Sequence, residues 1–204
     1  MSYQTAERRD EHTVNGVAVD RLFDTIDAIK AEPGIAKFKF RISNKWVNGG
    51  HNHTTIQDFY GALKDHPHDK PFELDADEPE VLLGQDKGPN PVEYLLTALA
   101  GCLTSSLVYH GAAKGIEVRG VESSLEGDLD LRGFLGLSKD VPVGYEEIRV
   151  YFTIDADISE QEKQELIQSA QKFSPVFNTV SGPTRVTVRL GREISSSLCS
   201  TSMM

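Results

Sequence analysis

The chain has 204 residues, of which 39% are hydrophobic and 25% charged, and its 21 basic and 31 acidic side chains give a net charge of −10. An acidic surface repels phosphate groups, so neither nucleic acid nor an anionic membrane is expected as a partner. The polar first residues lack the apolar core of a signal peptide, and no run of about 18 apolar residues predicts a transmembrane helix. Two cysteines, Cys102 and Cys199, do not make a disulfide framework, so a reducing cytoplasm is expected.

The N-terminal part of the chain predicts one helix after a loose polar lead at residues 1–16. Apolar residues recur at three- and four-residue steps over residues 17–31, which is typical of an amphipathic helix. Pro33 and Gly34 end this helix.

A β-hairpin is predicted next. Phe38, Phe40 and Ile42 alternate with basic residues, as in a half-buried strand. A turn at 48–50 allows the residues from His51 onward to return as the partner strand. The segment 64–80 is polar and carries three prolines, so it predicts a loop with one short edge strand at residues 72–74.

The longest helix is predicted over about residues 92–114, opened by Gly-Pro-Asn-Pro at 88–91 and stopped by Gly115. Its surface is apolar nearly all round, so we expect it to be buried in a core or at a subunit interface. Strands are predicted at 116–131 and 145–154.

The C-terminal part predicts a helix, a strand and a tail. Ser159 and Glu162 form a capping box, and the helix that they open ends near Phe173 because Pro175 cannot lie inside it. Residues 184–190 alternate as a last strand. The order of helices and strands along the chain indicates an α+β fold.

Cys102 is the first residue that could carry chemistry. Free cysteine is among the most buried residue types, so packing in a core is the simpler interpretation. Cys102 lies about ten residues into its helix, too far for the helix dipole to stabilise a thiolate strongly. Ser105, Ser106 and Tyr109 share its helical face and make that face more polar.

Two histidine pairs form the second candidate. His51 and His53 are two residues apart, so a strand points both to one side, which suits a metal, a bound anion or proton transfer. His66 and His68 lie in the predicted loop. No Cys-x-x-Cys or His-Glu-x-x-His accompanies them, so surface histidines are the simpler interpretation, and no metal or other cofactor is predicted.

Ser174 is the third candidate, as a nucleophile. No Gly-x-Ser-x-Gly motif surrounds it, and Ser-Pro at this position is typical of a helix end. The chain also contains no phosphate-binding loop and no dinucleotide-binding fingerprint.

Taken together, three segments resemble the OsmC/Ohr family. They are GPNPVEYLLTALAGCL at 88–103, GDLDLRGFLGL at 127–137 and SPVFNTV at 174–180. The resemblance covers roughly residues 36–190. It leaves residues 1–35 as an N-terminal extension with one amphipathic helix and residues 191–204 as a tail that is expected to be disordered.

The resemblance implies an α+β fold of curved antiparallel sheets packed around two long helices, built as an intertwined homodimer. It also implies the reduction of organic hydroperoxides by a peroxidatic cysteine, which Cys102 matches. In active members a second cysteine resolves the sulfenic acid as a disulfide, and a dithiol reductant such as a lipoyl protein restores the thiols.

This chain departs from the family pattern at three positions. Ser174 occupies the place of the resolving cysteine, and a serine cannot form the disulfide. Val92 occupies the place of the catalytic glutamate; Glu93 follows, about half a turn around the helix from Cys102 at about 100° per residue. The place of the arginine that stabilises the thiolate falls on His51, and Arg41 is the nearest arginine in sequence.

The resemblance therefore indicates a divergent OsmC-like subgroup without the resolving cysteine, and two functions stay open. One is thiol-dependent reduction of organic hydroperoxides by a single peroxidatic cysteine. Its predicted site residues are Cys102, His51, His53, Arg41 and Glu93. The other is non-catalytic binding of an apolar small molecule at the dimer interface.

Overall fold

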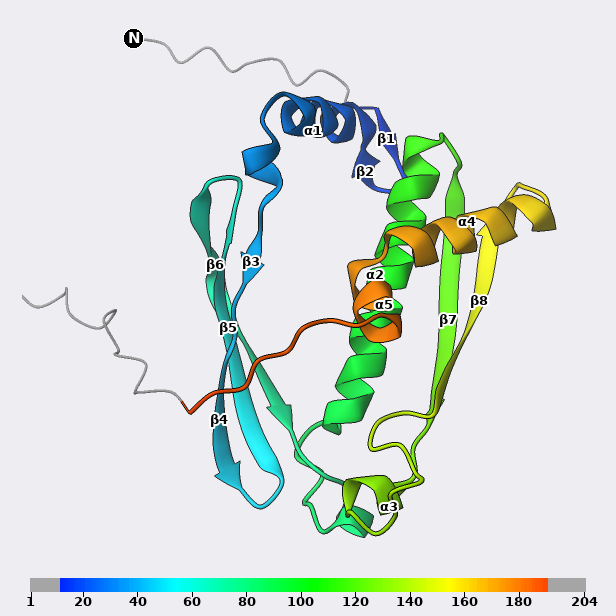
Figure 1. Ribbon diagram of the computed structural model, residues 1–204. Coiled ribbons are helices and arrows are strands. Elements are labelled where there is room, and N and C mark those ends of the chain that lie inside the picture. The colour runs from blue at the N-terminus through cyan, green and yellow to red at the C-terminus, as the bar shows by residue number, and fades with distance from the viewer. Residues whose placement is uncertain (1–11, 191–204) are drawn as a thin grey trace, which may run out of the picture.

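The computed structural model describes residues 12–190, in which one long helix lies between two antiparallel sheets (Figure 1). A four-stranded sheet from the first half of the chain lies on one side of helix α2 (Pro91–Ala113). A two-stranded sheet and helix α4 (Glu160–Phe173) lie on the other side. This arrangement confirms the predicted α+β class.

The described part of the N-terminal lead is ordered, so the expectation of a loose lead up to residue 16 is wrong there. Strands β1 (Thr13–Val14) and β2 (Val17–Ala18) form a hairpin. Both turn residues, Asn15 and Gly16, have positive φ angles of 54° and 76°, which a tight two-residue hairpin turn requires. The first eleven residues lie outside the described part of the chain.

Asn15 attaches this hairpin to the segment that follows α2. Its Nδ2 donates to the carbonyl of Ile116 at 2.9 Å, and its Oδ1 accepts from the amide of Val118 at 2.8 Å. Val14 and Val19 pack with Ala112 in a small buried cluster. The β1–β2 hairpin and the start of α1 are therefore fixed to the C-terminal end of α2.

The predicted amphipathic helix is confirmed as α1 (Val19–Ala31), and a short 3₁₀ helix, η1 (Pro33–Ala36), follows it at the proline. Val19 is buried, but Phe23 and Ile26 are 47% and 36% exposed. Part of the apolar stripe of α1 is thus uncovered in the single chain.

The predicted hairpin around residues 48–50 is confirmed as part of a larger sheet. Its strands are β3 (Lys39–Phe40), β4 (Ser43–Asn48), β5 (His51–Gly61) and β6 (Lys64–Ala76). Strand β5 is central: β6 pairs along one edge, and β3 and β4 pair in succession along the other.

The prediction of a loop at 64–80 is wrong, because β6 extends over 13 residues. Two features reconcile its prolines with a strand. Within residues 12–190 strand β6 pairs only with β5, and an edge strand tolerates a proline whose missing N–H faces away from the ladder. The register also shifts at Gln57, since Ile56 pairs with Phe72 while Asp58 pairs with Pro67. This bulge takes up the residues around the second proline.

One face of this sheet is aromatic and uncovered. The rings of Phe38, Phe40 and Phe59 lie 5.6–6.2 Å apart. Phe40 is 76% exposed and Phe38 52% exposed. The sequence predicts this face as half-buried, and the single chain does not cover it.

Helix α2 supplies the centre of the core. Asn90 caps it, Pro91 occupies its first position, and Gly115 follows its end with a φ of 70°. The buried core residues are Leu99, Leu103, Leu107, Ile154, Ala156, Leu166 and Ala170. By length and composition alone α2 could cross a membrane. A core helix of a soluble protein passes the same test, and α2 packs on α4 and the second sheet.

The second sheet and helix α4 (Glu160–Phe173) follow the prediction closely. Strands β7 (Val118–Asp128) and β8 (Glu147–Ala156) pair antiparallel, with the short helix α3 (Leu131–Phe134) between them. The capping box of α4 is formed by Ser159 and Glu162. After Phe173 a new helix, α5 (Pro175–Ser181), begins at the proline.

The predicted strand at 184–190 is absent from the described chain. Residues 183–190 have no assigned helix or strand and leave α5 toward the first sheet, as the orange-to-red segment of Figure 1 shows. Val186, Val188 and Leu190 are 80% exposed or more. A strand needs an edge to pair with, and none in the described part of this single chain pairs with these residues. The predicted tail at 191–204 lies outside the described residues.

Truncation of the core helix should destabilise the fold strongly. Leu103 is 2% exposed, so Leu103→Ala leaves a cavity and should cost about 2–5 kcal/mol in free energy of unfolding. Leu137 is 71% exposed, and Leu137→Ala should change it by less than about 0.5 kcal/mol. Urea titrations followed by circular dichroism measure both; equal losses would contradict the assigned core.

Candidate functional site

Cys102 lies on α2 at the edge of the core. Its side chain is half-buried, and within residues 12–190 its sulfur makes no hydrogen bond or ion pair. Helical spacing places Leu95 and Leu99 on the same face, seven and three residues before it. Tyr109, seven residues after it, is 53% exposed. Cys102 is therefore neither sealed in the core nor held by a fixed polar partner.

An apolar cavity of about 570 Å³ opens on this face of α2. Three elements form it: α2, β8 and α5. The apolar lining residues are Leu95, Leu99, Ile148, Val150, Phe177 and Val180. Cys102 lies about one helical turn beyond Leu99, next to this cavity rather than among its lining residues.

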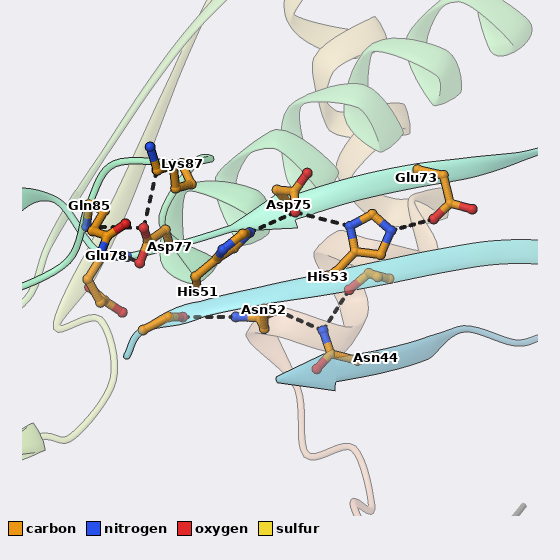
Figure 2. Close-up of polar contacts among 12 residues, drawn as sticks. Asn44, His51, Asn52, His53, Glu73, Asp75, Asp77, Glu78, Gln85 and Lys87 are labelled. Atoms are coloured by element: carbon orange, nitrogen blue, oxygen red, sulfur yellow. Dashed lines mark hydrogen bonds and ion pairs between the residues drawn. The ribbon is translucent and has the colours of Figure 1, made fainter. Parts of the chain in front are cut away.

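The prediction that His51 and His53 point to one side is confirmed (Figure 2). His51 Nε2 and His53 Nδ1 lie 2.8 and 3.0 Å from the same oxygen, Asp75 Oδ1. His53 Nε2 lies 2.7 Å from Glu73 Oε2, which also accepts from Thr55 Oγ1 at 2.8 Å. Cross-strand register explains this contact, since His53 pairs with Asp75 and Thr55 with Glu73.

Charge in this cluster follows from the hydrogen bonds. The carboxylates of Asp75 and, less strongly, Glu73 raise the pKa of His53 above its ordinary value. His51, followed by His53, lowers the pKa of Asp75, and Thr55, followed by His53, lowers that of Glu73. Both carboxyl groups are therefore ionised in the neutral range, and His53 holds its second proton to a higher pH than a free histidine.

His66 and His68 do not join this cluster. The ring of His66 stacks on Phe59 at 5.0 Å between centroids, and the ring of His68 meets Phe72 edge-on at 4.9 Å. In the described part of the chain, no three His, Cys, Asp or Glu side chains are placed to hold a metal ion.

Arg41 lies between β3 and β4 and is engaged by two carboxylates. Its guanidinium contacts Asp65 at 2.6 Å and Asp58 at 2.8 Å, and these bonds raise its pKa. No contact with Cys102 is present in residues 12–190.

Glu93 closes the capping box of α2. Its Oε2 accepts from the amide of Asn90 at 2.8 Å, so its carboxylate stays at the N-terminal end of the helix. It does not contact Cys102 in the described chain, as the helical spacing predicts. The catalytic roles of Cys102, His51, His53, Arg41 and Glu93 stay predictions.

Ser174 confirms the interpretation of a helix end. It is fully buried, and its Oγ accepts from the amide of Phe177 at 3.1 Å as the N-cap of α5. Its position therefore carries a structural role in this chain.

The acidic half of the histidine cluster is not predicted from the sequence, because the prolines of residues 64–80 indicate a loop. Glu73, Asp75 and Asp77 occur at every second position, which is the signal of carboxylates on one face of a strand. The Tyr94 hydroxyl donates to the backbone carbonyl of Asp75 at 2.7 Å. The end of β6, and with it the histidine cluster, is thus tied to the first turns of α2.

Asp77 shapes the loop between β6 and α2, which contains the 3₁₀ helix η2 (Glu80–Leu82). Asp77 is 1% exposed and accepts from the amides of Glu78, Gln85 and Lys87 at 2.8–3.2 Å (Figure 2). Burial alone would raise its pKa, but these amide donors outweigh burial and hold the pKa below its usual range.

The sequence matches a known protein family, and the fold is similar to solved structures. A family model for the OsmC-like protein matches residues 84–189. The OsmC-like protein of Mycoplasma pneumoniae is 23% identical, with a TM-score of 0.54, over 71% of this chain and 88% of that protein.

An organic hydroperoxide resistance protein, OsmC, from Legionella pneumophila is 17% identical, with a TM-score of 0.51, over 70% of this chain and 90% of that protein. At these identities the two structures show the shared fold. No curated protein matches the sequence.

Removal of the Asp77 carboxylate should loosen the loop that links the histidine cluster to α2. Asp77→Ala leaves three backbone amides without their acceptor, so the melting temperature should fall. Asp69, an exposed carboxylate on strand β6, supplies the control Asp69→Ala, which should leave the melting temperature unchanged.

The pH dependence of stability gives a second readout. Because folding lowers the pKa of Asp77, its stabilising contribution is present above the ordinary aspartate pKa of 3.8 and is lost as the pH falls through the folded-state value. Thermal melts from pH 3 to pH 7 should therefore show a smaller acid-induced loss in Asp77→Ala. Equal melts for both variants would contradict this role.

Proposed function

Because the chain belongs to the OsmC family, we propose that it reduces organic hydroperoxides through Cys102 as a single peroxidatic cysteine. The observation that carries the proposal is a half-buried thiol beside an apolar cavity, on a helix whose other inward side chains form the core. An organic hydroperoxide has an apolar body and a reactive O–O group, which fits a thiol next to apolar walls. The Legionella structural neighbour is named as an organic hydroperoxide resistance protein.

The proposed reaction has two steps. The Cys102 thiolate attacks the outer oxygen of the hydroperoxide, the O–O bond breaks, and the leaving alkoxide takes a proton to become an alcohol. Cys102 is then a sulfenic acid. A dithiol reduces it to the thiol, releases water and becomes a disulfide itself.

The proposed reaction needs an external reductant, because the chain has a serine and not a cysteine at position 174. Ser174 is a buried N-cap and has no sulfur with which to resolve the sulfenic acid. We therefore place the protein in the cytoplasm, where dithiol reductants are maintained. No metal or organic cofactor enters either step.

The hairpin histidines are the groups that we propose as helpers. His51 and His53 are held in place by Asp75, whereas Arg41 is occupied by two carboxylates and Glu93 by the helix cap. Proton transfer by a positioned histidine suits a reaction that moves a proton from a thiol to an alkoxide.

We also propose that the active form is a homodimer. The first sheet exposes several large apolar side chains, and exposed apolar surface of this kind marks an interaction surface. They are Phe38, Phe40, Ile42, Trp46 and Phe72. The unpaired segment 184–190 exposes further apolar side chains. A second copy of the chain would cover both.

Non-catalytic binding of an apolar small molecule is the second candidate. The cavity beside Cys102 is of a size that holds small ligands, and its lining combines aliphatic and aromatic side chains with the polar residues Glu146, Glu147, Thr179 and Ser181. This candidate needs no thiol chemistry, so the two functions differ in their dependence on Cys102.

Cumene hydroperoxide consumption with dithiothreitol as reductant tests the thiol. Cys102→Ser should reduce the rate to that without protein, because a serine hydroxyl is a far weaker nucleophile than a thiolate. Cys199→Ser, which removes the only other cysteine, should retain the rate. If Cys102→Ser is as active as the unaltered protein, the peroxidase proposal is wrong. An inactive protein that carries an apolar molecule in native mass spectrometry would favour the binding function.

Light scattering coupled to size-exclusion chromatography tests the dimer. The protein should elute with twice the mass of one chain, and Phe40→Asp should lower that mass by placing a charge on the apolar face. Lys39→Asp, at the neighbouring position on the other face, should leave the mass unchanged. A single-chain mass for the unaltered protein at all concentrations would contradict the dimer.

A further inference from the structure

Asp75 is the point at which the two hairpin histidines meet. A single oxygen, Asp75 Oδ1, lies within 3.0 Å of both His51 Nε2 and His53 Nδ1 (Figure 2). An ionised carboxylate oxygen can only accept hydrogen bonds, so both of these ring nitrogens carry a hydrogen. Asp75 thus determines which nitrogen is protonated in each ring.

The two histidines differ in whether a ring nitrogen remains free to accept a proton. His53 faces Asp75 with one ring nitrogen and Glu73 with the other, so both nitrogens are donors and the ring is a clamped imidazolium. Such a ring has no free lone pair and serves to hold Asp75 in position.

His51 keeps one nitrogen free. Its Nε2 donates to Asp75, so in the neutral ring Nδ1 carries the lone pair. Among residues 12–190 no hydrogen bond to this Nδ1 is present, and the side chain is 24% exposed. His51 therefore has an oriented and accessible proton acceptor, and His53 does not.

Four parts of the chain place charged or titratable side chains around His51 and His53. Strand β4 contributes a lysine opposite His53, β6 and the loop after it contribute four carboxylates and a lysine, and α2 contributes a tyrosine. These groups are Lys45, Glu73, Asp75, Asp77, Glu78, Lys87 and Tyr94.

We propose that Asp75 is the positioning residue of His51, and that His51 Nδ1 is the atom that exchanges a proton with Cys102 during peroxide reduction. The inference rests on the proposed function and on the proposed homodimer. Within one chain, Tyr94 joins Asp75 to α2 eight residues before Cys102, roughly 12 Å along the helix axis. The assembled dimer has to bring His51 to the thiol.

A single base, His51, can both take up and return the proton that the reaction moves. His51 Nδ1 takes the proton of the Cys102 thiol, the thiolate attacks the outer peroxide oxygen, and the O–O bond breaks with its electron pair on the alkoxide. The imidazolium then returns the same proton to the alkoxide. Sulfur is oxidised to the sulfenic acid, the peroxide is reduced to an alcohol, and His51 ends neutral as it began.

Nitrogen-15 spectra of the histidine rings test the positioning without any peroxide. In the unaltered protein the neutral ring of His51 should be the Nε2–H tautomer, and His53 should carry hydrogen on both ring nitrogens. In Asp75→Asn the His51 tautomers should mix, and the pKa of His53 should fall because its strongest partner has lost its charge. Asp69→Asn, an exposed carboxylate of the same strand, should leave both rings unchanged.

Rates of Cys102 oxidation by cumene hydroperoxide from pH 5 to pH 9 test the catalytic part. Asp75→Asn should lower the rate roughly 10- to 100-fold, a part of the roughly 10²–10⁴-fold that general acid–base catalysis supplies. The remaining rate should rise steadily with pH, as thiolate formation then depends on the solvent. His51→Ala should lose rate similarly and recover it with added imidazole, which a purely structural residue would not allow.

The outcomes separate the two proposals. If Cys102→Ser keeps full peroxide turnover, the proposed function is wrong, whatever the spectra show. If Cys102→Ser is inactive while Asp75→Asn keeps the rate and pH profile of the unaltered protein, the role of Asp75 alone is overturned. A slow Asp75→Asn protein whose His51 tautomer is unchanged, or a His51→Ala protein that imidazole does not rescue, likewise overturns it.

Discussion

The buried carboxylate of Asp77 is the constraint on which the geometry of the site depends. Three backbone amides from both ends of the loop donate to it and so restrain the conformation of the loop between β6 and α2. That conformation fixes where β6 ends, and so where Asp75 meets the histidines. It also brings Tyr94 and the capped start of α2 against the end of the strand. Without this loop the hairpin and the helix would be two independent parts.

Helices could be predicted from this sequence because their signals are local. The 3.6-residue period and the capping boxes at Asn90 and Ser159 involve residues a few positions apart, and helices α2 and α4 begin and end close to their predictions. Strand β6 could not be predicted in the same way. Its prolines are compatible with a strand only at a sheet edge beside a bulge, and both conditions are set by the partner strand.

In the candidate site, too, features with a local sequence signal could be predicted and features that depend on a partner strand could not. Cys102 is indicated by resemblance to a family, and the paired direction of His51 and His53 follows from strand period. Their carboxylate partners depend on cross-strand register, which no local pattern specifies once β6 is assigned to a loop. The segment 184–190 shows the opposite error. Its alternation is real, but a strand forms only where another edge is available.

The bulge opposite Gln57 divides the pairing of β5 with β6 into two blocks, and each block positions a different set of side chains. Pairing from Asn52 to Ile56 fixes the histidines against Glu73 and Asp75, and pairing from Asp58 to Gly61 aligns the aromatic rings beyond it. The residues between these two blocks, 68–71, have no ladder partners to lose. Chain length can therefore vary there during evolution, by insertion or deletion, while the register at Asp75 is retained.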